Sequence, residues 1–115
     1  MSRKARPVTV HMVPQSHIDM AWEWDWNETL SVFGTTFGAV LGAMDRTPTF
    51  TFTQNSAAAY DAVERHHPAL FKRIRERVKQ GRWEVSGGAW VEAFEAIASG
   101  ESLVRQYFYG KRWFR

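Results

Sequence analysis

Residues 8–26 read Val8-Thr-Val-His-Met-Val-Pro-Gln-Ser-His17-Ile-Asp19-Met-Ala-Trp22-Glu-Trp24-Asp-Trp26. The first six of them are mostly apolar and β-branched, which predicts a buried strand over residues 8–13. Pro14 cannot donate to a sheet and marks the end of regular pairing. In extended backbone, residues i and i+2 point the same way, so we expect His17 and Asp19 to project together beyond the strand. In α/β folds, ligands bind at this carboxyl end of the strands.

The pair His17 and Asp19 has two interpretations. An imidazole nitrogen beside a carboxylate oxygen is half of a divalent-metal site. The same pair can instead form a hydrogen bond that satisfies two polar groups at a strand end.

Three tryptophans crowd the loop that follows, in a chain with 6 Trp among 115 residues: Trp22, Trp24 and Trp26. Indole rings beside polar groups are typical of carbohydrate sites, because the flat apolar faces of sugars stack on them. Tryptophan is also a core residue that packs by its large apolar area. Both interpretations stay open at this point.

The rest of the chain alternates helical and strand patterns. Apolar spacing and turn residues predict helices over residues 27–45, from Ser56, after Pro68 and from Ser99, and strands over residues 49–53 and 83–91. Gly87-Gly88 interrupts the second of these strands and suggests a bulge or a close backbone approach. Strands separated by helical crossovers pair in parallel, so we expect three consecutive βα units of an α/β fold. Gln54, Trp90 and Glu92 then stand with His17 at the carboxyl ends of the strands.

Composition limits the choice of protein class. A chain of 115 residues with 44% hydrophobic residues and no cysteine is at most one folded domain without disulfides or thiolate ligands. No apolar run reaches the length of a membrane span, and the basic tail at residues 1–7 leads into no signal-peptide core, so we expect a cytoplasmic location. The net charge of +3 is spread over a solvated helix face and both ends, and we expect no nucleic-acid partner.

Four stretches together resemble one protein family. The run His17-Ile-Asp19-Met-Ala-Trp22 is similar to the metal-and-sugar motif of glycoside hydrolase family 38, the α-mannosidases. Three further stretches agree with that family in order and spacing, so that the resemblance covers residues 8–115: Phe50-Thr-Phe-Thr-Gln54, then Gly81-Arg-Trp-Glu84 with Gly87-Gly-Ala-Trp90-Val-Glu92, then Ser99 to Gln106 with Tyr109-Gly-Lys-Arg112.

The resemblance implies a fold and a set of site residues. The family's catalytic domain is a seven-stranded (β/α) barrel, of which residues 8–115 would be the first three units. His17 and Asp19 match two zinc ligands of the family, and Trp22 matches an aromatic residue that stacks on mannose. Trp24, Trp90 and Glu92 are expected to line the same sugar site. Beyond Glu92 the chain has Ala93-Phe94, where family members have Pro-Asp.

The resemblance also implies what the site lacks. Family members are retaining, zinc-dependent enzymes that hydrolyse α-mannosidic bonds in oligosaccharides through an aspartate nucleophile and an acid/base carboxylate. Both carboxylates and two further zinc ligands are expected beyond the position of Arg115, so none of the catalytic residues is expected in this chain. We therefore expect the chain to be inactive alone, and to need the remainder of the domain or self-association for stability. The alternative is a non-catalytic carbohydrate-binding or assembly module derived from that domain.

Overall fold

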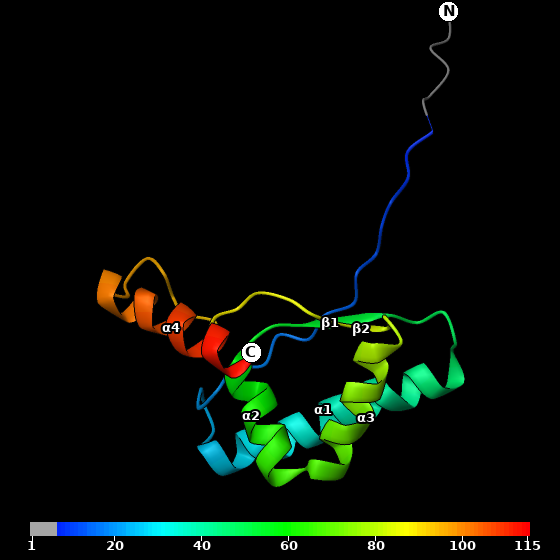
Figure 1. Ribbon diagram of the computed structural model, residues 1–115, viewed down its shortest axis with the longest axis horizontal. Coiled ribbons are helices and arrows are strands. Elements are labelled where there is room, and N and C mark those ends of the chain that lie inside the picture. The colour runs from blue at the N-terminus through cyan, green and yellow to red at the C-terminus, as the bar shows by residue number, and fades with distance from the viewer. Residues whose placement is uncertain (1–6) are drawn as a thin grey trace, which may run out of the picture.

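The computed structural model describes residues 7–115, so that all of the basic tail predicted at residues 1–7 except Pro7 lies outside the described residues. Its helices and strands, in chain order, are α1 (Trp26–Arg46), β1 (Phe52–Gln54), α2 (Ala57–His66), α3 (Pro68–Lys79), β2 (Trp83–Val85) and α4 (Gly100–Trp113). Figure 1 shows α1, α2 and α3 gathered beneath the strands, with α4 at one end.

Helix α1 forms where the apolar periodicity predicted a helix. Asp25 caps its start, since the carboxylate accepts a hydrogen bond of 2.9 Å from the backbone N–H of Glu28. Its inward face is a stripe of side chains at helical spacing that are almost fully buried: Phe33, Phe37, Leu41 and Met44. Burial of this stripe holds the helix against the strands and α2.

The sheet is parallel, as expected, but smaller than expected. Strand β1 pairs with β2 in a register that sets Phe52 opposite Trp83, and both strands have three residues. A third segment joins through a single parallel bridge between Gln15 and Thr53. Among residues 7–115 the structure therefore contains two strands, and three complete βα units are not formed.

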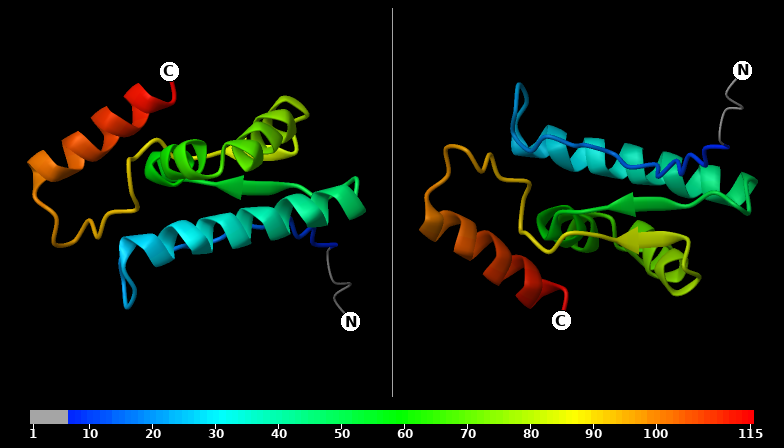
Figure 2. Two further views of the ribbon diagram at one scale, coloured as in Figure 1. Left: turned by 90° about the horizontal axis from the view of Figure 1, so that it is seen from below. Right: turned by 90° about the horizontal axis from the view of Figure 1, so that it is seen from above.

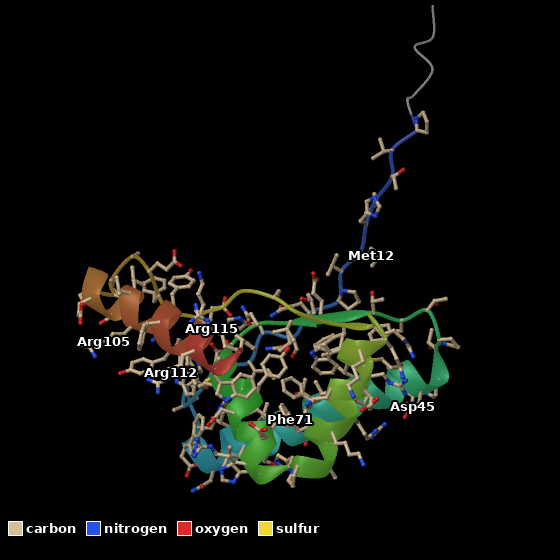
Figure 3. All side chains as sticks on the ribbon, in the orientation of Figure 1. Met12, Asp45, Phe71, Arg105, Arg112 and Arg115 are labelled. Atoms are coloured by element: carbon tan, nitrogen blue, oxygen red, sulfur yellow. The ribbon has the colours of Figure 1, made fainter. Side chains whose placement is uncertain are left out.

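The predicted strand at residues 8–13 is wrong. These residues run away from the body (Figure 1), and Figure 3 shows Met12 standing clear of all packed side chains. Continuing the register of the Gln15–Thr53 bridge backwards would set them beside residues 46–51, which end α1 and form a turn. A turn offers no ladder of hydrogen bonds, so the apolar run has no partner strand in the described chain.

The strand predicted over residues 83–91 ends earlier than predicted. Only residues 83–85 pair, and Gly87 and Gly88 take φ values of +82° and +146°, which break the extended backbone. Figure 2 shows the segment after β2, yellow to orange, leaving the strand and turning back into α4. Residues 86–98 are therefore a loop. The alternation of side chains along a strand does not apply to this loop.

The centre of the core is Trp83 on β2. The indole is 1% exposed, and its ring meets Phe52 and Phe37 at centroid distances of 4.7 Å and 5.4 Å. Its Nε1–H donates to the Tyr60 hydroxyl, which in turn donates to the Gln54 carbonyl oxygen, each at 2.9 Å. Burial raises the pKa of Tyr60, so the phenol stays protonated and can donate. Polar and apolar contacts thus join α1, α2 and both strands.

Arg82 fastens the far end of α1 to this core. Its guanidinium donates to the carbonyl oxygens of Met44, Thr47 and Phe50, at distances of 2.9, 2.7 and 3.1 Å. These carbonyls belong to the last turn of the helix and the turn after it, where helical partners run out. The result is an α/β domain with four helices and a small parallel two-stranded sheet in its described part. None of these helices is long and apolar enough to span a bilayer.

Candidate metal and sugar site

His17 lies between two carboxylates. Its Nε2 is 3.1 Å from Asp19 Oδ1, and its Nδ1 is 3.1 Å from Glu92 Oε2. The three side chains are 58%, 43% and 54% exposed respectively, so the cluster opens to solvent. Asp19 comes from the same loop as His17, whereas Glu92 comes from the loop after β2. The fold therefore brings together three of the residues that the sequence singled out.

The carboxylates determine the electrostatics of the cluster. The hydrogen bond to Asp19, followed by the negative charge of Glu92, raises the pKa of His17 above its ordinary value. The ring is solvent-exposed, so this interaction is screened. The cluster is a locally negative position that favours a cation, whether a proton on the imidazole or a metal ion.

Thr29 holds the loop that carries His17 and Asp19. This residue is fully buried at the start of α1, and its hydroxyl accepts hydrogen bonds from the Ala21 backbone N–H at 3.2 Å and from Trp24 Nε1 at 3.1 Å. The same hydroxyl donates to the Asp25 carbonyl oxygen at 3.1 Å. Ala21 has φ +53°, a left-handed conformation that a residue with a Cβ rarely adopts. One hydroxyl thus fixes the sharp turn between Asp19 and Trp22.

The loop that carries Glu92 is held through its backbone. The first N–H groups of α2 donate to it, Ala57 to the Ala89 carbonyl at 3.1 Å and Ala58 to the Trp90 carbonyl at 2.9 Å. These bonds satisfy donors that have no partner within the helix.

Helix α4 holds the same loop from the other side. Gln106 accepts from the Trp90 N–H through its backbone carbonyl at 2.8 Å, and from the Val91 N–H through its side chain at 2.9 Å. Close approach is allowed by Gly110, where a methyl group would overlap the Gly88 carbonyl oxygen and lie 2.8 Å from the Trp90 nitrogen. Glu92 therefore follows a backbone that is anchored on two helices.

The three tryptophans expected at the sugar site, Trp22, Trp24 and Trp90, lie in different surroundings. Trp22 is 71% exposed, next along the chain to the sharp turn at Ala21. Trp24 is half-buried, and its N–H is committed to Thr29. Trp90 lines a groove of about 520 Å³ together with residues of α2 and α4, among them Asp61 and Trp113. Trp90 and Glu92 were expected to share one face of a strand, and in the loop they line different depressions.

Gln54 ends strand β1, as predicted. It is 2% exposed, and its Oε1 has no hydrogen-bond partner within the described residues. Its backbone carbonyl accepts from Tyr60 and from the Ser86 N–H. A buried acceptor without a donor is rare, because its desolvation is not compensated. The end of β1 therefore has a polar atom with capacity for a further donor.

As ligand atoms, His17 Nε2 and Asp19 Oδ1 lie at a separation that fits two positions of a metal site. Nitrogen and oxygen ligands at about 2.0 Å from a tetrahedral zinc ion lie about 3.3 Å apart, and the observed separation is 3.1 Å. The same distance is that of a hydrogen bond, so the pair is ready for either role. Within residues 7–115, no group of three or more His, Asp or Glu side chains is arranged to hold a metal ion. A closed coordination shell needs ligands in addition to this pair.

Comparison with known proteins decides the family. The model of the "Glycosyl hydrolases family 38 N-terminal domain" matches residues 7–115. This chain belongs to glycosyl hydrolase family 38. Its similarity to "Alpha-mannosidase G" of Dictyostelium discoideum is 39% identity over 105 residues, which is 91% of this chain and 10% of the relative. The human "Alpha-mannosidase 2C1" is 35% identical over 106 residues, 92% of this chain and 10% of that protein.

A fungal relative gives the same result. The "Alpha-mannosidase" of Saccharomyces cerevisiae is 34% identical over 106 residues, which is 91% of this chain and 10% of the relative. The predicted resemblance to family 38 is thus confirmed. The chain spans about one tenth of the length of these curated relatives.

Sequence patterns assigned no role to the residues that support the two loops of the His17 cluster. Thr29 left one signal, because it lies on the buried stripe of α1, one turn before Phe33, where an apolar residue is expected. Gln106 and Gly110 lie in the fourth stretch that resembles the family, but the stretch assigned no role to either residue. Their roles depend on α4 crossing the loop 86–98, and a helical pattern does not show what the helix crosses.

Proposed function

We propose that this chain provides the first part of the active site of a zinc-dependent, retaining α-mannosidase that hydrolyses terminal α-mannosidic bonds in oligosaccharides. The observation that supports it most directly is the adjacent placement of His17 Nε2 and Asp19 Oδ1, 3.1 Å apart, in a chain of glycosyl hydrolase family 38. The relatives are named as alpha-mannosidases, which favours this substrate class.

In this proposal His17 and Asp19 hold the zinc ion through one nitrogen and one oxygen. When bound there, zinc would supply a Lewis acid for the hydroxyl groups of the sugar. Trp22, 71% exposed, offers an indole face on which the apolar side of the sugar stacks. Trp22 stands three residues after Asp19, directly after the sharp turn at Ala21 that the Thr29 hydroxyl holds.

Hydrolysis with retention needs two carboxyl groups, one as nucleophile and one as acid/base. We propose that the two carboxyl groups, and the ligands that complete the zinc shell, belong to further residues of a longer protein, comparable in length to the relatives. In that protein the α/β domain described above would form the first part of a larger barrel. The 115-residue chain by itself would then bind zinc weakly and turn over no substrate, since zinc sites normally use three or four protein ligands.

Calorimetric zinc titration tests the metal part of this proposal. We expect weak binding by the 115-residue chain and loss of binding in a His17→Ala/Asp19→Ala double variant. A matched control is Glu64→Ala/His66→Ala, which removes an exposed acid and an exposed histidine two residues apart on α2. Retained binding in the control supports the assignment. Equal binding by the wild type and the His17→Ala/Asp19→Ala variant contradicts it.

Two further measurements test the proposed sugar binding at Trp22 and the proposed inactivity of the 115-residue chain. In the presence of zinc, methyl α-mannoside should broaden or shift the indole resonance of Trp22, methyl α-galactoside should do so less, and Trp22→Ala should remove the response. A chromogenic α-mannoside should not be hydrolysed by the chain alone. Turnover would contradict the proposed absence of a nucleophile. A sugar response that does not depend on zinc would favour a non-catalytic carbohydrate-binding module.

A further inference from the structure

Glu92 reaches His17 from a distant part of the chain. Asp19 is two residues from His17 on one loop, and its Oδ1 lies 3.1 Å from Nε2 of the ring. Glu92 follows β2 and contacts the opposite ring nitrogen, Nδ1, at 3.1 Å. This contact from a second segment of the chain restrains the rotation of the His17 imidazole ring.

The backbone beneath Glu92 is fixed well enough to serve as such a restraint. One and two residues before it, the N–H groups of Val91 and Trp90 donate to Gln106 at 2.9 Å and 2.8 Å. Just upstream, the Ala89 and Trp90 carbonyls accept from the first turn of α2. The carboxylate is exposed, but its starting point is anchored on two helices.

The chemistry of imidazole then assigns the two nitrogens. A metal ligand must be neutral imidazole, which carries one N–H and one free lone pair. An ionised carboxylate only accepts hydrogen bonds, so it favours the N–H on the nitrogen that faces it. With a metal held at Nε2, the proton would belong on Nδ1, which the Glu92 carboxylate faces at 3.1 Å.

We propose that Glu92 is a positioning residue, which holds His17 with Nδ1–H toward its own carboxylate and Nε2 toward Asp19 and the metal. This inference rests on the proposed metal site and changes the role of Glu92 from a sugar contact to an orienting contact on a ligand. A carboxylate behind a ligating histidine fixes the tautomer and raises the basicity of the ligand nitrogen.

Zinc affinity of the 115-residue chain measures this effect. Glu92→Ala should weaken zinc binding by about 10–100-fold, as loss of an outer-shell partner does. Glu92→Gln keeps an acceptor oxygen without the charge, so its affinity should lie between wild type and Glu92→Ala. The matched control is Glu95→Ala, an exposed carboxylate three residues further along the same loop. It should bind zinc as the wild type does. Equal losses in Glu92→Ala and Glu95→Ala, or no loss in either, would overturn the inference.

The ring itself provides a second readout. Long-range proton–nitrogen spectra of the zinc-loaded chain should show His17 protonated at Nδ1, and a ring protonated at Nε2 would overturn the proposal. The metal-free chain separates this inference from the proposed function. If the wild type binds no zinc, the metal site fails, and the Nδ1 resonance still decides whether Glu92 orients the ring. It should shift in Glu92→Ala and not in Glu95→Ala; an unshifted resonance in Glu92→Ala would contradict the orienting role.

Discussion

The core around Trp83 and the cluster around His17 are built in opposite ways. Trp83 is 1% exposed, packs on aromatic rings of α1 and β1 and donates a hydrogen bond to Tyr60 of α2. The His17 side chain is 58% exposed and meets two carboxylates. The core derives its order from apolar area removed from water, which contributes about 25 cal/mol per Å². The His17 cluster derives its order from a few hydrogen bonds made by the backbone beneath it.

The contrast separates stability from chemistry in this chain. Exposed ion pairs contribute little to the free energy of unfolding, typically about 0–1 kcal/mol. His17, Asp19 and Glu92 can therefore be replaced without loss of the fold, which makes the proposed zinc measurements interpretable. The residues that couple the two regions are Thr29 and Gly110, since each is packed in the body and supports a loop of the site.

The largest effect is expected in the core, from Trp83→Ala. It removes the ring packed on Phe37 and Phe52 and leaves the Tyr60 hydroxyl without its donor. We expect a loss of about 3–5 kcal/mol in the free energy of unfolding, measured by urea titration. Trp22→Ala, at a 71% exposed position, is the matched control, and its unfolding free energy should change by no more than about 0.5 kcal/mol. Similar losses in both variants would mean that the two regions do not differ as described.

Gly110→Ala should affect the connection between the core and the Glu92 loop. Its methyl group would overlap the Gly88 carbonyl oxygen and lie 2.5 Å from the Ala89 carbonyl carbon, so α4 or the loop must move. We expect a loss of about 3 kcal/mol in urea unfolding, at the upper end for overpacking. Gly100→Ala adds the same methyl group to the same helix with nothing within 4 Å. A loss in Gly100→Ala as large as that in Gly110→Ala would rule out the steric explanation.

Thr29→Val should disturb the other loop with little change in shape. Valine fills the same space but cannot accept from the Ala21 N–H and Trp24 Nε1, which lose their partner. We expect a loss of about 1–2 kcal/mol, since two part-buried hydrogen bonds are lost, together with shifted amide resonances for residues 20–25. Thr35→Val, at an exposed position of the same helix, should leave both unchanged. Unshifted resonances in Thr29→Val would show that the turn at Ala21 does not depend on this hydroxyl.

The smallest effect concerns protonation of His17 in the metal-free chain. Asp19 and Glu92 raise its pKa, so the stabilisation that they give is full below the ordinary pKa and is lost as pH rises through the raised value. Asp19→Asn should lower the pKa of His17 toward its ordinary value, and Glu92→Gln should lower it less, as followed by titration of the ring resonances. Glu95→Gln is the control and should leave the pKa unchanged. A pKa of His17 that is the same in all four proteins would show that the three side chains do not meet in solution.

Several features could be predicted from the sequence because they depend on local physics. The apolar stripe of α1, the parallel pairing of β1 with β2 and the start of α4 at Ser99 each follow from spacing, turn residues or capping groups near in sequence. The joint projection of His17 and Asp19 follows from their two-residue spacing in extended backbone. Family membership followed from four short motifs in the expected order.

The wrong predictions are those that needed a partner. Residues 8–13 have the composition of a buried strand, yet a strand requires a neighbour, and residues 46–51 end a helix and turn. Residues 86–91 were expected to continue the strand beyond an interruption at Gly87-Gly88, and the positive φ values of these two glycines end it instead. Trp90 and Glu92 were predicted to share one face of a strand. Because both lie in a loop, that alternation of side chains does not apply to them.

The sequence by itself determined the family, the helices, the direction of strand pairing and the adjacency of His17 and Asp19, because neighbouring residues settle each of them. Only the tertiary structure decided that Glu92 faces Nδ1 of the His17 ring, that Thr29 holds the turn at Ala21 and that α4 crosses the loop at Gly110. These contacts depend on how the helices and loops pack against one another. Packing of that kind depends on three-dimensional shape and leaves no spacing to read along the chain.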